Sequence, residues 1–202
     1  MRQTDFHKPW NERENPVKVK RHEILDYETY QDQRDDIRDQ VMRIKAPRRI
    51  HVPPYLTFLF ENRDTIRYQI QEMVRVERMV RESDIQHEID TYNELLGDQD
   101  ELGCTLLIEI EEPTERDGLL RRWVGLMDCL YLTLEDGSRA PAVFDRRQIG
   151  EERLSSVQYL KFRTNGKGPV AIGIDHPDFP KETPLTSEQR LALRCDLQAS
   201  QS

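Results

Sequence analysis

Residues 55–96 constrain the fold more than any other part of the chain. The first six of these residues are apolar and aromatic, which is typical of a buried strand. After a short charged turn, apolar residues recur with a helical period, and Asn62 or Asp64 can cap the helix that they predict. A second helix can begin at Ser83-Asp84 and end at Gly97. The stretch therefore predicts a strand, a turn and two successive helices.

The two predicted helices carry polar residues on faces that are otherwise apolar. Glu77 falls on the apolar stripe of the first helix, and Glu88 borders the apolar face of the second. A carboxylate on such a face needs a partner, because an unpaired buried charge is costly. If the helices pack together, their polar residues converge. The residues expected at this cluster are Arg67, Gln71, Glu72, Arg75, Glu77, Glu88 and Tyr92.

Three interpretations of this cluster remain open. It can be an ion-pair network that fixes how the helices dock, which is the commoner use of such groups. It can bind a polar ligand, with Arg67 and Arg75 holding an anionic group while carboxylates orient them. It can also hold a metal ion, although the chain lacks the Glu-x-x-His pairs of di-iron helices. The ligand-binding candidates are Arg67, Gln71, Glu72, Arg75, Glu77 and Tyr92.

A second candidate site follows the short apolar strand predicted for residues 170–174. Asp175, His176 and Pro177 come directly after it and could present an acid–base or metal-binding pair. The alternative is a turn in which Asp175 bonds local backbone and a neighbour satisfies His176. The metal-ligand candidates are Glu72, Glu77, Glu88, Asp175 and His176.

The rest of the chain predicts an α+β fold, with a largely antiparallel sheet packed with a central helix pair and flanking helices. Strands without regular helical crossovers between them, and the Asp-Gly hairpin sequence at residues 136–137, favour antiparallel pairing. Residues 1–22 are predicted to be a flexible N-terminal extension, residues 23–197 a single domain, and residues 198–202 a frayed tail.

Composition excludes several classes of protein. The net charge of −8 argues against non-specific nucleic-acid binding, which depends on neutralising phosphates. No apolar run approaches the roughly 20 residues that span a bilayer, and the N-terminus has no signal-peptide core, so no membrane association is expected. The three cysteines are far apart, which favours a reducing cytoplasm. The sequence leaves open whether the protein forms a homodimer through an edge strand or the helix pair. It contains no catalytic motif that defines a reaction.

Several stretches, in order, resemble the DUF3501 family of bacterial proteins over roughly residues 25–197. They are FENRDTIRYQIQEMVRVER, EIDTYNELL, TLLIEIEE, SSVQYLKF and AIGIDHPDF, followed by a helix ending in CDL. The family's name leaves its activity undefined. Its genes lie beside those for rubrerythrin-like and iron–sulfur oxidoreductase proteins, so the resemblance implies a redox or oxidative-stress setting and those proteins as partners. The residues carried over are Glu61, Arg67, Gln71, Glu72, Arg75, Glu77, Glu88, Asp90, Tyr92, Asp175 and His176.

The function expected from these observations is that of a cytoplasmic accessory or binding protein of a redox system, with a polar Arg/Glu site on the helix pair. The alternative is a metal-binding protein or enzyme that uses the carboxylates of Glu72, Glu77 and Glu88, together with His176.

Overall fold

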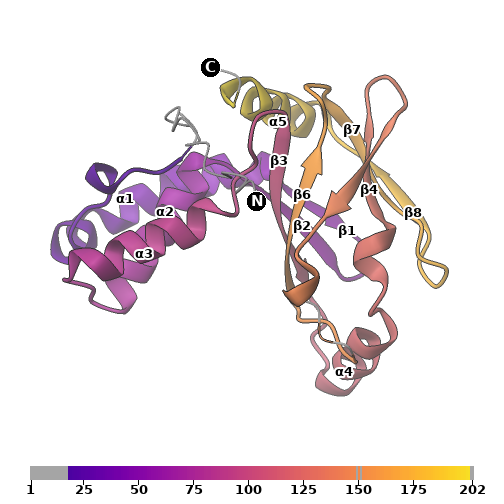
Figure 1. Ribbon diagram of the computed structural model, residues 1–202, viewed down its shortest axis with the longest axis horizontal. Coiled ribbons are helices and arrows are strands. Elements are labelled where there is room, and N and C mark those ends of the chain that lie inside the picture. The colour runs from indigo at the N-terminus through magenta and orange to yellow at the C-terminus, as the bar shows by residue number, and fades with distance from the viewer. Residues whose placement is uncertain (1–17, 149, 151, 201–202) are drawn as a thin grey trace, which may run out of the picture.

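A single antiparallel sheet and a separate group of helices make up the molecule (Figure 1). The computed structural model describes residues 18–148, 150 and 152–200. The eight strands follow the order β1-β2-β3-β6-β5-β4-β7-β8 across the sheet. They are β1 (Arg49–Val52), β2 (Leu56–Glu61), β3 (Glu101–Ile108), β4 (Leu130–Leu134), β5 (Arg139–Val143), β6 (Val157–Arg163), β7 (Pro169–Ile174) and β8 (Lys181–Pro184).

The sheet curls until its two edges approach each other. The edge strands are β1 and β8, and the Nζ atom of Lys181 at the start of β8 donates to the carbonyl of Pro53, 2.9 Å away in the turn after β1. Inside the curl, alternate side chains of the strands form the larger hydrophobic core. Helix α5 (Ser187–Ala199) covers one end of this core and α4 (Pro113–Arg122) lies at the other (Figure 1).

Three helices form a lobe beside the sheet. They are α1 (Tyr27–Lys45), α2 (Arg63–Val76) and α3 (Glu82–Asn93), and α2 and α3 together connect β2 to β3. This helical lobe has a second core of its own, whose buried side chains come from α2, α3, the turn after α3 and the segment before α1. Its buried members are Val19, Ile24, Ile66, Ile70, Val74, Ile85, Ile89 and Leu96, with Tyr27, Met79, Tyr92 and Leu95 packed against them.

The predicted α+β fold with an antiparallel sheet is confirmed, but the predicted central position of the helix pair is not. Helices α2 and α3 pack with α1 beside the sheet, because their apolar faces complete the second core rather than the first. Strand β8 was not predicted. None of the helices in the described part of the chain has the length and hydropathy needed to cross a bilayer.

The ends of the chain differ from the expected boundaries. Residues 1–17 of the predicted flexible extension, and residues 201–202 of the predicted tail, lie outside the described residues. Val19 is buried, and the side chain of Asn93 accepts from its N–H at 2.9 Å and donates to its carbonyl at 3.0 Å. A 3-10 turn then spans Arg21–Glu23, and α5 extends to Ala199. The packed part of the chain therefore begins earlier and ends later than predicted.

Gly103 in β3 lets the turn after α3 approach the sheet closely. A Cβ atom at this position would lie 1.9 Å from the backbone carbonyl oxygen of Leu95. We expect Gly103→Ala to lower the free energy of unfolding by about 2 kcal/mol or more, since backbone must move to relieve the overlap. Urea unfolding checks this, with Gly118→Ala in α4 as the matched control. Nothing lies within 4 Å of a Cβ at Gly118, so the control should be stabilised by up to about 1 kcal/mol. Equal effects at the two positions would contradict the prediction.

Candidate functional site

The polar groups of α1 and α2 meet at the carboxylate of Glu72. The hydroxyl of Tyr30 donates to Glu72 Oε1 at 2.6 Å, and Arg34 donates to both carboxylate oxygens, from Nε at 2.8 Å and from Nη2 at 3.1 Å. Arg75, one turn further along α2, donates to Oε2 at 3.1 Å. One carboxylate therefore receives four hydrogen bonds and faces two guanidinium groups, in a cluster defined by Tyr30, Arg34, Glu72 and Arg75.

This environment fixes the charge of Glu72. Burial alone would raise the pKa of its carboxyl group, but hydrogen bonds from Arg34, Tyr30 and Arg75 outweigh burial and lower the pKa from 4.5 to about 2. Burial, and then the hydrogen bond to Glu72, raise the pKa of the Tyr30 hydroxyl far above its ordinary value. Neither group exchanges protons near neutral pH, so the cluster is unsuited to general acid–base catalysis.

Gln71 joins the segment before α1 to α2. Its side-chain oxygen accepts from the N–H of Leu25 at 2.9 Å, and its side-chain nitrogen donates to the carbonyl of Leu25 at 2.8 Å. The amide thus pairs with the backbone as a neighbouring strand would. Gln71 was predicted to contact a ligand, and in the structure it holds the wall of a cavity in place.

That cavity, of about 230 Å³, lies between the segment before α1, α1 itself and α2. Apolar side chains of α1 and of the segment before it form part of its walls, and polar groups come from Glu23, Gln40, Arg67, Gln71 and the two tyrosines. The lining residues are Glu23, Leu25, Tyr30, Ile37, Gln40, Val41, Ile44, Arg67, Tyr68 and Gln71. Small-molecule sites combine apolar walls with a few fixed polar groups, and this cavity offers both. We call it the α1–α2 cavity.

Arg67 is the loosely held cation of the α1–α2 cavity. Its Nη2 atom lies 3.1 Å from Asp64, and its Nη1 atom lies 4.0 Å from Glu23. Both side chains of the Arg67–Asp64 pair are almost half exposed, and such ion pairs contribute little to the stability of the fold. Glu23 has a closer partner in Arg63, at 2.8 Å. Arg67 can therefore turn to an incoming anion at little cost.

The predicted convergence of Glu77 and Glu88 with Glu72 is wrong. Helix α2 ends at Val76, so Glu77 becomes its exposed C-cap, and Arg78 then takes a positive φ of 48° and turns the chain away. The apolar stripe on which Glu77 was placed assumed that the helix continued to Val80. Glu88 lies half-buried on α3, where its charge helps to raise the pKa of Tyr92, whose main cause is burial.

Asp175 and His176 form a turn rather than a joint site. Asp175 is exposed and accepts from Arg139 at 2.7 Å. His176 is buried, and its Nδ1 atom accepts from the backbone N–H of Asp178 at 3.3 Å. Across the described residues, no three His, Cys, Asp or Glu side chains lie together as a metal site would require. The proposed metal ligands thus belong to separate parts of the molecule.

Tyr30 and Arg34 are not among the site residues that the sequence analysis singled out. A pattern that could have identified them is present in the sequence. Arg34 falls between Tyr30 and Ile37 on the same stripe of α1 that continues to Val41, so its helical phase directs it towards α2.

Comparisons with known proteins agree with the fold. A crystal structure of a novel protein of unknown function from Burkholderia pseudomallei K96243 matches with a TM-score of 0.81 and 31% sequence identity, covering 90% of this chain and 100% of that chain. No curated protein matches. The family model described as "Protein of unknown function (DUF3501)" matches residues 18–197. Since this match spans most of the sequence, the chain belongs to the DUF3501 family.

Proposed function

We propose that this protein is a binding protein for a small organic anion with an apolar body, held in the α1–α2 cavity. The observation that carries the proposal is the cavity itself, where Arg67 lies beside apolar side chains from Leu25, Ile37 and Val41. A charged head group would pair with Arg67, and the apolar walls would cover the rest of the ligand. The Tyr30–Arg34–Glu72–Arg75 cluster would hold α1 against α2 and keep the cavity open.

A binding role fits the chemistry better than catalysis does. The carboxylate of Glu72 is saturated with hydrogen bonds and its pKa is held at about 2, so it offers neither a proton nor a free lone pair. Gln71 is occupied by backbone. Arg67 is left as the polar group best able to select a ligand, and a guanidinium binds carboxylates without reacting with them.

Calorimetry with hexanoate and its neutral analogue hexanamide tests this proposal. We expect hexanoate to bind more tightly than hexanamide, because only the acid can form a charge-assisted pair with Arg67. Arg67→Gln should weaken hexanoate binding by about tenfold to a hundredfold, as expected for the loss of one charged hydrogen bond, and should leave hexanamide binding unchanged.

Arg43→Gln is the matched control, since Arg43 is an exposed arginine of α1 that does not line the cavity. If Arg67→Gln and Arg43→Gln weaken hexanoate binding equally, long-range charge rather than a site explains the effect. If neither hexanoate nor hexanamide binds to the full chain, the proposed ligand class is wrong.

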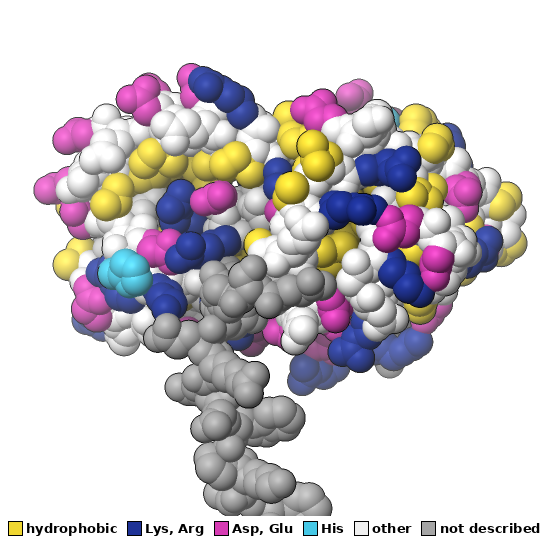
Figure 2. Space-filling view, turned by 90° about the horizontal axis from the view of Figure 1, so that it is seen from above, with side chains coloured by type: hydrophobic (Ala, Val, Ile, Leu, Met, Phe, Trp, Pro, Cys, Tyr) yellow, Lys and Arg dark blue, Asp and Glu magenta, His cyan; other side chains and the backbone are white. Residues whose placement is uncertain are grey.

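We further propose that the protein serves as an accessory protein of a cytoplasmic redox or oxidative-stress system. The support is the family membership, since the DUF3501 resemblance implies rubrerythrin-like or iron–sulfur oxidoreductase partners. On the face shown in Figure 2, acidic and basic side chains alternate and a band of hydrophobic side chains crosses the helical lobe, a mixture that suits protein contacts. Affinity purification of the full chain from a lysate of the cells that produce it should recover such redox proteins. If none of them is enriched over a purification with an unrelated bait, the proposed redox role is wrong.

A further inference from the structure

The α1–α2 cavity has charges of both signs at its polar end. Glu23 lines the cavity together with Arg67, and its Oε1 atom lies 4.0 Å from Arg67 Nη1 and 2.8 Å from Arg63 Nη2. Asp64 lies 3.1 Å from Arg67. Two carboxylates and two guanidinium groups are therefore linked here, and their charges balance. A ligand whose head group has one charge of each sign keeps this balance, whereas a simple anion does not.

Glu23 has capacity for a further hydrogen-bond donor. Its side chain is only 11% exposed, and its Oε2 atom accepts from the backbone N–H of Lys20 at 2.8 Å. With Arg63 at Oε1, each oxygen has one close donor from the part of the chain that the structure describes. A carboxylate offers about four acceptor sites. An ammonium group on a ligand would therefore find a carboxylate that is already held in position and still able to accept.

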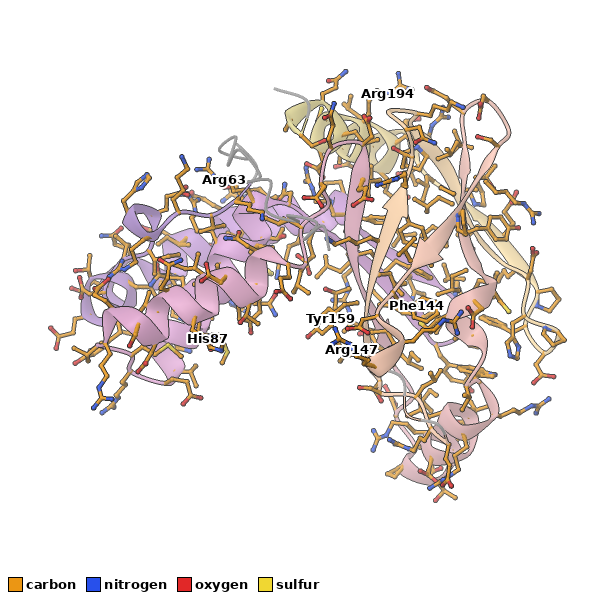
Figure 3. All side chains as sticks on the ribbon, in the orientation of Figure 1. Arg63, His87, Phe144, Arg147, Tyr159 and Arg194 are labelled. Carbon is orange, nitrogen blue, oxygen red and sulfur yellow. The ribbon has the colours of Figure 1, made fainter. Side chains whose placement is uncertain are left out.

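The polar end of the cavity reaches solvent. The side chains of Arg63 and Arg67 are each 43% exposed. Figure 3 shows Arg63 at the edge of the helical lobe, across from His87 of α3. A ligand would therefore keep its charged head group at this edge and place its apolar part inside the cavity.

The apolar part of the cavity suits a short aliphatic chain. Ile37, Val41 and Ile44 of α1 line the cavity at positions i, i+4 and i+7, so they form one stripe of the helix. The cavity volume of about 230 Å³ is smaller than the roughly 300–1,000 Å³ of sites for drug-sized ligands. The ligand expected here is therefore a small metabolite.

We propose that the ligand of the α1–α2 cavity is an α-amino acid with an aliphatic side chain. Arg67 holds its carboxylate, as in the proposed function on which this assignment rests. The α-ammonium group donates to Glu23, and the side chain lies against the stripe formed by Ile37, Val41 and Ile44. An α-amino acid carries its two charged groups on one carbon atom, and this arrangement matches Glu23 and Arg67, which lie 4.0 Å apart.

Calorimetry with the full chain and acids that share one carbon chain tests this assignment. The acids are hexanoate, norleucine, which adds an α-ammonium group, and 6-aminohexanoate, an isomer of norleucine with the ammonium group at the far end. We expect norleucine to bind about tenfold more tightly than hexanoate, because it gains a charge-assisted hydrogen bond to Glu23. We expect 6-aminohexanoate to bind more weakly than hexanoate, because its ammonium group would enter the apolar part of the cavity without a partner.

Glu23→Gln removes the charge of Glu23 and keeps an acceptor for the N–H of Lys20. This variant should bind norleucine about tenfold more weakly, as expected for the loss of one charge-assisted bond, and should bind hexanoate no more weakly than the unaltered chain does. Glu28→Gln is the matched control, since Glu28 is an exposed glutamate of α1 that does not line the cavity. It should leave the affinities for both acids unchanged.

Equal binding of norleucine and 6-aminohexanoate would overturn the assignment, because the position of the ammonium group would then not matter. If hexanoate binds and norleucine binds no more tightly, the amino-acid assignment is wrong while the proposed anion site stands. If none of these acids binds, the proposed function is wrong as well. Equal weakening of hexanoate and norleucine by Glu23→Gln would also overturn the assignment, since Glu23 would then support the cavity rather than accept from the ligand.

Discussion

Asp196→Ala should destabilise the protein by about 3–5 kcal/mol, because it leaves the guanidinium of Arg48 buried without its counter-ion. Asp196, in α5, accepts from Arg48 Nε at 2.7 Å and from Nη2 at 2.8 Å, and the two side chains are only 13% and 10% exposed. The side chain of Asn62, which caps α2, also donates to Asp196 at 3.3 Å. One carboxylate thus joins α5, the 3-10 turn before β1 and the start of α2. Urea unfolding followed by circular dichroism measures the loss.

Glu82→Ala provides the control for this prediction. The pair formed by Arg21 and Glu82 has the same geometry, with distances of 2.7 Å, but it lies at the surface. Its loss should cost less than about 1 kcal/mol. A comparable loss in the two variants would mean that burial does not govern the strength of these pairs. The double variant Arg48→Leu/Asp196→Leu should recover part of the stability, because it leaves no unpaired buried charge.

Local patterns predicted the elements whose ends are fixed by neighbouring residues. The cap of α2 is an example, since the Asn62 side chain accepts from the N–H of Thr65 at 3.0 Å. Helix α5 begins with a contact of the same kind, since Thr186 and Gln189 form hydrogen bonds in both directions, at 2.9 and 3.2 Å. Such contacts span three residues, so the sequence displays both partners within one short window.

Contacts between distant residues were not predictable in the same way. An ion-pair network that includes Glu72 was one of the interpretations left open, but two of its partners in the structure, Tyr30 and Arg34, lie about 40 residues earlier in the chain. Helical phase places a side chain on a face and does not say which helix that face meets. The error at Glu77 has a different origin, since ending α2 one residue before it was enough to move its carboxylate from the interior to solvent.

Strand β8, at the edge of the sheet, illustrates a third reason why the sequence did not predict part of the structure. Strand β8 has the sequence KETP, which has neither apolar alternation nor strong β-propensity. It becomes a strand because β7 offers it a free edge, and its residues pair in register from Ala171–Pro184 to Ile174–Lys181. A strand that owes its conformation to its neighbour carries little information in its own residues.

Glu72→Gln should destabilise the protein by about 3 kcal/mol at pH 7, and the difference should disappear in acid. The pKa of Glu72 falls from 4.5 to about 2 on folding, because hydrogen bonds from Arg34, Tyr30 and Arg75 outweigh the opposing effect of burial. A pKa lowered by folding contributes stability above the unfolded value and loses it as the pH falls towards the folded value. The contribution of Glu72 is therefore complete above about pH 5 and absent below about pH 2.

Stability curves of the two proteins between pH 7 and pH 2 separate this cluster from the other carboxylates. Other acidic groups lower the stability of both proteins together, so only the difference between the curves reports Glu72. Convergence of the curves between pH 4.5 and pH 2 would show that the ionised carboxylate of Glu72 holds α1 against α2. A constant difference across this range would show that Glu72 acts by its shape and neutral hydrogen bonds alone.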